Sequence, residues 1–246
     1  MSVFEAIISG IVQGVTEFLP ISSSGHLVIL HKLLGLKAPQ LVFDIFLHVG
    51  TLLAIFIVFW NDIVDIFTTK KKIGLFILIG TLATAFFVLI FGKGIEGIFT
   101  NSKIVGAMLI ITGIWLIFGN FVRFTTGPLT GFKAIFIGLA QGIATLPGIS
   151  RSGATISTAL FLGVDPTKAV KFSFLLSIPA IIGAFLFKIK GVVSAGFNIN
   201  YLLGLIASCI VGILSLKLLL RVICGNRFHL FGFYCIALGG LTLLVL

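Results

Sequence analysis

The chain has 246 residues, of which 59% are hydrophobic and 10% are charged, and its formal net charge is +10. Soluble domains carry about a quarter of charged residues, so this composition excludes an ordinary soluble protein and indicates an integral membrane protein. The basic residues lie mainly beside apolar stretches, which favours a role in membrane orientation over nucleic-acid binding. The opening sequence MSVFEAIISG lacks the basic segment expected of a secretory leader.

Long apolar stretches predict the membrane spans, because about 20 helical residues cross the hydrocarbon layer. Six stretches meet this requirement: 40–60, 73–92, 104–122, 169–188, 200–222 and 228–246. Two further apolar regions, 3–36 and 132–164, are interrupted by Pro, Gly and Ser and predict broken hairpins that re-enter on one side. The sequence therefore predicts an all-α integral membrane fold with six transmembrane helices and two re-entrant hairpins.

The two interrupted regions carry related sequences, QGVTEFLPISSSG at 13–25 and QGIATLPGISRSG at 141–153. They align without a gap at a spacing of 128 positions (141 minus 13). Each is followed by three predicted spans, which indicates a duplication with repeats at 1–122 and 132–246 in one membrane domain. Three spans reverse the direction of the chain, so the second repeat is predicted to be inverted relative to the first.

The first motif places polar side chains on both sides of Pro20. Gln13 and Glu17 are four residues apart and share one face of a helix, which Pro20 ends. Ser22 is a candidate helix cap, and the amides behind it are suited to attract phosphate. On the helix that follows, Ser23 and the residue three positions later, His26, are expected to lie side by side.

The second motif, PGISRSGAT at 147–155, supplies Arg151. A charged side chain inside a membrane is costly unless it is paired or meets an anion, and a guanidinium is well shaped for phosphate. Ser150, Ser152 and Thr155 add hydroxyl groups beside it. Because Ser23 and Arg151 occupy equivalent places in the two motifs, the inverted fold is expected to bring them together.

Each polar residue also has a purely structural interpretation. Membrane serines often bond helix carbonyls, an isolated histidine can be a structural hydrogen-bonding group, and Glu17 could simply neutralise Arg151. A carboxylate, a histidine, an arginine and several hydroxyls in two related motifs favour a functional site instead. Asp44 and His48, in FDIFLHVGT, are spaced for one helical face and are expected to lie just behind the side chains that line the cavity.

The two motifs closely resemble the signature motifs of undecaprenyl-diphosphate phosphatases of the bacitracin-resistance type, and the resemblance covers the whole chain. It implies hydrolysis of a long-chain polyprenyl diphosphate to the monophosphate and inorganic phosphate. This reaction recycles the lipid carrier for peptidoglycan synthesis and confers bacitracin resistance. The E/Q-x-x-x-E motif of the family falls on Gln13 and Glu17, although many members have glutamate at the first position.

The resemblance also implies roles for individual residues. Ser23 is the expected nucleophile, with Glu17 or His26 taking its proton and Arg151 holding the phosphate. A divalent cation, Mg²⁺ or Ca²⁺, is expected on Glu17 and, less firmly, on Gln13. The expected substrate-binding hydroxyls are Ser22, Ser24, Ser150, Ser152 and Thr155. An alternative mechanism makes His26 the nucleophile.

A transporter or flippase for polyprenyl phosphate is the competing function, since inverted repeats with broken helices are common in transporters. The expected partners are a polyprenyl diphosphate and the plasma membrane, with no nucleic acid and with homo-oligomers left open. On the predicted topology, six basic residues lie on the side of the N-terminus and ten lie on the other side. The richer side is expected to be cytoplasmic, so both termini and the opening of the active site are predicted on the outer face.

Overall fold

The computed structural model describes residues 1–36, 40–92, 95–99, 101–119, 127–188, 198–222 and 228–246. Over these residues the secondary structure is helical except for one isolated bridge between Gly127 and Val164. The helices are α1 (Val3–Thr16), α2 (Ser23–Leu33), α3 (Leu41–Val58), α4 (Trp60–Phe67), α5 (Lys71–Phe91), α6 (Ile95–Ile98), α7 (Ser102–Phe118), α8 (Gly131–Ile143), α9 (Arg151–Phe161), α10 (Pro166–Phe187), α12 (Ile199–Val222) and α13 (Leu230–Val245). The predicted all-α class is confirmed.

Four helices are long and apolar enough to cross a membrane: Leu41–Val58, Lys71–Phe91, Pro166–Phe187 and Ile199–Arg221. They coincide with four of the six predicted spans. The spans predicted at 104–122 and 228–246 correspond to α7 and α13, which are shorter apolar helices of 17 and 16 residues. Large apolar side chains face outward on the long helices. Since so much exposed apolar surface suits lipid rather than water, the chain is a multi-pass membrane protein.

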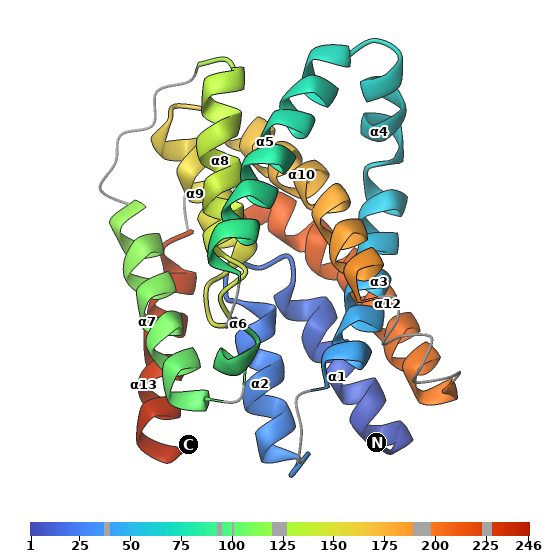
Figure 1. The fold of residues 1–246 in the computed structure, drawn as a ribbon, viewed down its shortest axis with the longest axis vertical. Coiled ribbons are helices and arrows are strands. Elements are labelled where there is room, and N and C mark those ends of the chain that lie inside the picture. The colour runs from blue at the N-terminus through green and yellow to red at the C-terminus, as the bar shows by residue number, and fades with distance from the viewer. Residues whose placement is uncertain (37–39, 93–94, 100, 120–126, 189–197, 223–227) are drawn as a thin grey trace.

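Two helical hairpins approach the middle of the molecule from opposite ends (Figure 1). The pair α1 and α2 comes from the end that holds both termini, and the pair α8 and α9 comes from the other end. The connections at 17–22 and 144–150 break the two regions that the sequence predicted to be interrupted. Helix–break–helix structure is therefore present at both predicted places.

The two breaks lie back to back, and glycine permits this approach. A Cβ added to Gly25 would lie 3.2 Å from the Cα of Gly148, and one added to Gly153 would lie 3.4 Å from the Cβ of Pro20. Gly148 itself has φ +98°, a conformation that side chains disfavour. Each motif thus packs against the turn of the other, and the two helix starts meet at the centre.

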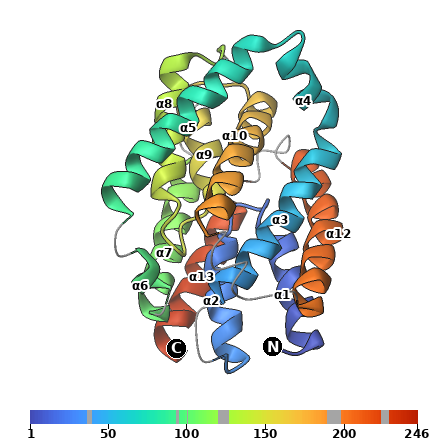
Figure 2. The ribbon, with the colours of Figure 1, turned by 45° about the vertical axis from the view of Figure 1, so that its right-hand side comes forward.

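Each hairpin also packs its first helix against a helix from the other half of the chain (Figure 2). Helix α1 lies beside α12, and α8 lies beside α5. A Cβ added to Gly10 would lie 2.4 Å from the carbonyl oxygen of Gly204, and one added to Gly138 would lie 2.2 Å from that of Gly80. Close backbone contact through small residues is typical of helix packing in membranes, and it holds both hairpins in place.

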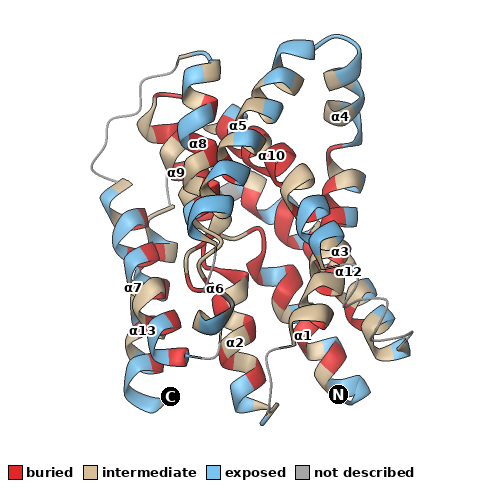
Figure 3. Ribbon diagram, viewed as in Figure 1, coloured by how far each residue is buried: buried red, intermediate tan, exposed pale blue. Residues whose placement is uncertain are grey.

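Buried residues gather around the two breaks and the helix faces turned toward them (Figure 3). The largest apolar cluster includes the fully buried Phe18, which lies in the first break and whose ring meets that of Phe174 edge-on at 5.3 Å. Burying this aromatic pair fixes the first break against α10.

Ion pairs mark the end of the molecule opposite the termini. Lys171 Nζ lies 2.9 Å from Asp62 Oδ1, and Lys70 Nζ donates to Asp65 Oδ2 at 2.7 Å. The hydrogen bond from Lys70 lowers the pKa of the exposed Asp65 carboxyl. Such charged pairs belong in water, which places this end outside the hydrocarbon layer.

Candidate active site

Glu17 is the point where the two motifs meet. It follows α1 directly and is 5% exposed. Its Oε1 accepts a hydrogen bond from Arg151 Nη2, and its Oε2 accepts one from Ser23 Oγ. The structure therefore brings Ser23 and Arg151 together, as the alignment of the motifs predicted, with one carboxylate between them.

Gln13 and His48 complete the surroundings of this carboxylate. Gln13 Nε2 donates to Glu17 Oε2 at 3.0 Å and lies 2.9 Å from His48 Nδ1. The same His48 nitrogen is 3.5 Å from Glu17 Oε2. Gln13 Oε1 is buried and has no hydrogen-bond partner among the described residues, and Gln13 itself is fully buried beside Glu17.

A cavity of about 280 Å³ lies in front of these groups; we call it the polar cavity. Its polar lining consists of Glu17, Ser23, Ser24, His48, Thr84, Gln141, Thr145, Ser150 and Arg151, and its apolar lining includes Ile45, Phe99, Ile181 and Phe185. The starts of α2 and α9 both contribute to the wall. A ligand with an anionic head and an apolar body fits such a lining.

The polar cavity is suited to phosphate oxygens. Arg151 and Glu17 neutralise each other, but Arg151 Nη1 is buried without a partner in the described part of the chain. The first amides of a helix have no partner within it, and the helix dipole favours an anion at this end. Two such helix starts and a free guanidinium nitrogen therefore face one cavity, which is a strong combination for binding phosphate.

Two serines hold the helix starts in position. Ser22 Oγ accepts from Gly25 N at 3.3 Å at the start of α2, and Ser150 Oγ accepts from Gly153 N at 3.1 Å at the start of α9. Ser22 has φ +67°, which is unfavourable for a residue with a side chain. The strained backbone of Ser22 lies directly before the predicted nucleophile, Ser23. Strained backbone of this kind clusters at functional sites.

The other predicted hydroxyls are divided between the cavity and the scaffold. Ser24 lines the polar cavity. Ser152 Oγ donates to the carbonyl of Leu19 at 3.1 Å, and Thr155 Oγ1 lies 2.5 Å from Ser173 Oγ. Neither Ser152 nor Thr155 is among the residues lining the cavity. They join the second hairpin to its neighbours, and direct contact between these two and phosphate stays a prediction.

His26 is held against α13. Its Nδ1 lies 2.7 Å from the carbonyl oxygen of Ser22, its Nε2 lies 2.8 Å from the hydroxyl of Tyr234, and the two rings stack at 5.6 Å. The lining of the polar cavity does not include His26. The structure therefore groups Ser23 with Glu17 and Arg151 rather than with His26.

Asp44 and His48 share one face of α3, as predicted, but they have different neighbours. Asp44 Oδ1 is buried 4.0 Å from His31 Nε2, whereas His48 reaches Gln13 and lines the cavity. Both residues were expected behind the side chains that line the cavity, but His48 is itself part of the lining. Its position one helical turn after another buried polar residue was the available signal.

The described residues contain no group of three or more His, Cys, Asp and Glu side chains that could hold a metal ion by themselves. Mg²⁺, however, commonly uses one or two protein oxygens together with substrate phosphates. The Glu17 carboxylate and the unpartnered Gln13 Oε1 form such a pair of oxygens. Of these two residues only Glu17 lines the polar cavity, so a hard cation that arrives with its substrate fits at Glu17, and its contact with Gln13 stays a prediction.

The fold and site together define a class, a multi-pass membrane protein with a buried serine–carboxylate–arginine site for a phosphate group. Residues 6–241 match the family described as bacitracin resistance protein BacA. The chain is 42% identical over 275 residues to an undecaprenyl-diphosphatase of Desulfosudis oleivorans, with 99% of this chain and 98% of that protein aligned. It is 40% identical over 274 residues to the enzyme of the same name from Methanosphaera stadtmanae, with 100% and 98% aligned. The chain belongs to the BacA family.

Proposed function

We propose that this protein hydrolyses undecaprenyl diphosphate, or a polyprenyl diphosphate of similar length, to the monophosphate and inorganic phosphate. The observation that carries the proposal is one buried carboxylate, Glu17, in contact with both Ser23 and Arg151. The names of the full-length relatives support the substrate. By this reaction the protein would recycle the lipid carrier of cell-wall synthesis and confer resistance to bacitracin.

In the first step, Ser23 Oγ bonds to the terminal phosphorus and passes its proton to Glu17 Oε2. The bond between this phosphorus and the bridging oxygen breaks, and its electron pair stays on that oxygen. The polyprenyl monophosphate leaves and takes up the proton from Glu17. The hydrogen bond already joining Ser23 to Glu17 supplies the geometry that an activated nucleophile requires.

In the second step, water attacks the phosphoserine and gives a proton to Glu17. The bond between Ser23 Oγ and phosphorus breaks, the proton returns to Ser23, and inorganic phosphate leaves. Throughout, Arg151 Nη1 and the first amides of α2 and α9 stabilise the phosphate oxygens. Catalysis of phosphoryl transfer depends chiefly on such positioning and charge stabilisation.

A divalent cation, Mg²⁺ or Ca²⁺, would be held by Glu17 and Gln13 Oε1 together with substrate oxygens. When bound, it would neutralise the negative charge of the diphosphate. Both protein ligands belong to the first motif, whereas Arg151 belongs to the second.

Two alternatives use the same cavity. His26 could act as nucleophile, as base or as acid for the leaving group, but it would first have to release Tyr234. A lipid transporter would need the arginine and the helix amides but no serine in contact with a carboxylate. The pairing of Ser23 with Glu17 therefore favours hydrolysis by serine.

In the membrane, we place α1–α2 and α8–α9 as re-entrant hairpins of two inverted repeats, with α3, α5, α7, α10, α12 and α13 as the six spans. The more basic end, opposite the termini, would be cytoplasmic. On a background without the native cysteines, Lys103→Cys should react with an impermeant maleimide in intact cells and Lys71→Cys should not. The reverse pattern would invert this topology.

Phosphate release from farnesyl or undecaprenyl diphosphate tests the function itself. The detergent-solubilised protein should release phosphate with Mg²⁺ or Ca²⁺ and lose this activity in EDTA, in Ser23→Ala and in Arg151→Ala. Folded wild-type protein that binds polyprenyl phosphate but releases no phosphate would direct attention to lipid transport instead.

A further inference from the structure

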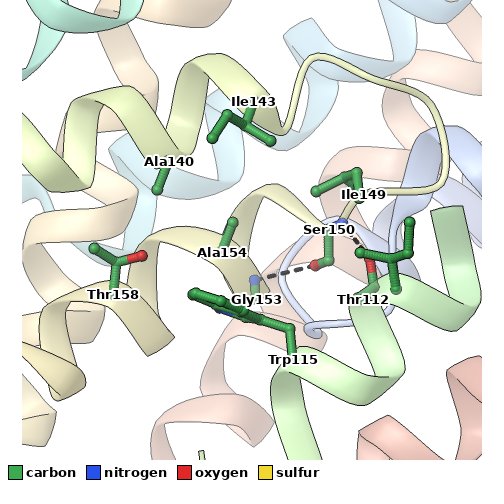
Figure 4. A pocket seen from close by; sticks show the side chains of 10 residues that line it. Thr112, Trp115, Ala140, Ile143, Ile149, Ser150, Gly153, Ala154 and Thr158 are labelled. Atoms are coloured by element: carbon green, nitrogen blue, oxygen red, sulfur yellow. Dashed lines mark hydrogen bonds between the residues drawn. The ribbon is translucent and has the colours of Figure 1, made fainter. Parts of the chain in front are cut away.

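A second cavity lies between α7, α8 and α9 (Figure 4); we call it the apolar cavity. Its volume is about 240 Å³. Trp115 of α7 lies across from Ala140 of α8 and Ala154 of α9, and the small size of the two alanines leaves the space open. The complete lining is Ile111, Thr112, Trp115, Ala140, Ile143, Ile149, Ser150, Gly153, Ala154 and Thr158.

This cavity adjoins the polar cavity, because Ile149 and Ser150 line both. At this shared wall, the amide and the hydroxyl of Ser150 already form hydrogen bonds within the protein. Ser150 N donates to Thr112 Oγ1 at 3.1 Å, and Ser150 Oγ accepts from Gly153 N at 3.1 Å. A molecule that extends from the polar cavity past this wall therefore meets a surface that offers it apolar contacts.

The apolar cavity also reaches the outer surface of the protein. Ile111, Trp115 and Ile143 contribute to its lining and are 49%, 44% and 44% exposed. These side chains lie on α7 and α8, on a face that would contact lipid. The cavity thus extends from the wall that it shares with the polar cavity to side chains on the outer surface of the protein.

In the first hairpin a large side chain occupies the equivalent position. Ala154 corresponds to His26 at the same spacing of 128 positions (154 minus 26). The imidazole of His26 stacks on Tyr234 of α13, whereas the methyl group of Ala154 leaves space in front of Trp115 of α7, whose ring meets that of Phe161 edge-on at 5.2 Å. In the hairpin that carries Arg151, the small side chains of Ala140 and Ala154 leave this space open.

We propose that the apolar cavity binds the isoprenoid units nearest the diphosphate while the head group lies at Arg151. This inference rests on the proposed function. A volume of about 240 Å³ is below the range of roughly 300–1,000 Å³ for sites that enclose drug-sized ligands. The apolar cavity therefore accommodates only the first part of the isoprenoid chain, and the rest of that chain lies in the bilayer.

Filling the cavity tests the proposal. Phosphate release is measured with farnesyl diphosphate and with methyl diphosphate, and the ratio of the two kcat/KM values is compared. Ala154→Phe should lower this ratio at least about tenfold, since hydrophobic pockets discriminate by this much for a single methylene group. Ile114→Phe, on the exposed face of α7, adds similar bulk outside the cavity and should keep the wild-type ratio. An unchanged ratio in folded Ala154→Phe would overturn the proposal.

Photo-crosslinking of the wild-type protein gives an independent test that needs no variant to fold. A farnesyl diphosphate analogue with a diazirine on its first isoprenoid unit should label peptides containing Trp115 or Ala154, and excess farnesyl diphosphate should abolish the labelling. Labelling confined to Phe99 or Phe185, which line the polar cavity, would show that the isoprenoid chain runs through the polar cavity instead. Labelling by a diazirine phospholipid that farnesyl diphosphate does not displace would assign the cavity to bilayer lipid. If the wild-type protein hydrolyses neither diphosphate, the proposed function fails. Labelling confined to Phe99 or Phe185, or labelling by phospholipid that farnesyl diphosphate does not displace, would reject only the proposed binding site.

Discussion

The two broken hairpins have the same framework but carry different chemistry. Ser22 and Ser150 each cap the second helix of a hairpin, and each has another serine hydroxyl 3.3 Å away, that of Ser24 or Ser152. At the next position the hairpins diverge, because Ser23 begins α2 and Arg151 begins α9. Two similar frameworks thus present the proposed nucleophile from one side and a cation from the other.

A second divergence involves the carboxylate. Glu17 corresponds to Thr145 at the same spacing of 128 positions (145 minus 17), and Thr145 Oγ1 donates to the nearby carbonyl of Gly142 at 2.7 Å. The first hairpin therefore supplies both the proposed nucleophile and the proposed base. In the proposed site, two similar helix starts hold the anion, while reactivity depends on the residues that differ between the two hairpins.

The largest effect is expected from Ser23→Ala. Loss of the nucleophile should reduce kcat for farnesyl diphosphate by about 10³-fold or more, with the unfolding midpoint close to that of wild type. Ser24→Ala, which removes the neighbouring hydroxyl in the same cavity, should cost less than about tenfold because the Ser23–Glu17 pair persists. Equal losses in both variants would remove the distinction drawn between these serines.

Arg151→Lys tests the contribution of the second hairpin. Lysine keeps the charge but loses the fork that lets Arg151 contact Glu17 and a phosphate oxygen together. We expect kcat to fall by about 10²–10³-fold, as for the loss of one preorganised donor to a transition-state oxygen. Activity within threefold of wild type would show that a point charge is sufficient at this position.

His26→Ala asks whether the first hairpin contributes a second reactive group. Since His26 bonds to Tyr234 and does not line the polar cavity, we expect kcat to fall less than about tenfold. Tyr234→Phe, which removes the hydroxyl but keeps the ring, should behave similarly. A loss of about 10²–10⁴-fold in His26→Ala alone would instead assign this histidine acid–base or nucleophilic chemistry.

The smallest effects on chemistry are expected from the glycines that hold the hairpins. Gly10→Ala and Gly138→Ala each place a Cβ against a backbone carbonyl of the opposite half, and each should destabilise the fold by about 1–3 kcal/mol. Thermal unfolding in detergent measures this change. Gly240→Ala, which has open space around the added Cβ, is the control. Destabilisation in only one of the two hairpin variants would contradict their equivalent packing.

The long helices, the two breaks and the alignment of the motifs could be predicted from the sequence, because they depend on residues that are close together in the chain. The long apolar stretches gave the long helices, and the Pro, Gly and Ser residues located both breaks. The ungapped match between motifs aligned Ser23 with Arg151, and the structure places both in contact with one carboxylate. The helix break after Glu17 followed directly from Pro20, whose ring cannot continue a helix.

The remaining features depend on tertiary neighbours that local spacing does not specify. His26 was expected beside Ser23, but Tyr234, 208 positions later, lies within reach of its imidazole and pairs with it. Similarly, His48 faces the site only because α3 packs next to α1, which brings it to Gln13. The apolar cavity results from the small side chains of Ala140 and Ala154, and isolated alanines give little signal in a sequence.

The most direct test of the account is to identify the phosphorylated residue. Protein given farnesyl diphosphate labelled at its terminal phosphate is quenched during turnover, and the labelled peptide is mapped by mass spectrometry. We predict phosphate on Ser23 in the wild type and no phosphopeptide from Ser23→Ala. A phosphopeptide carrying the label on His26, or turnover that continues in Ser23→Ala, would contradict the assignment of the nucleophile to the first hairpin's serine.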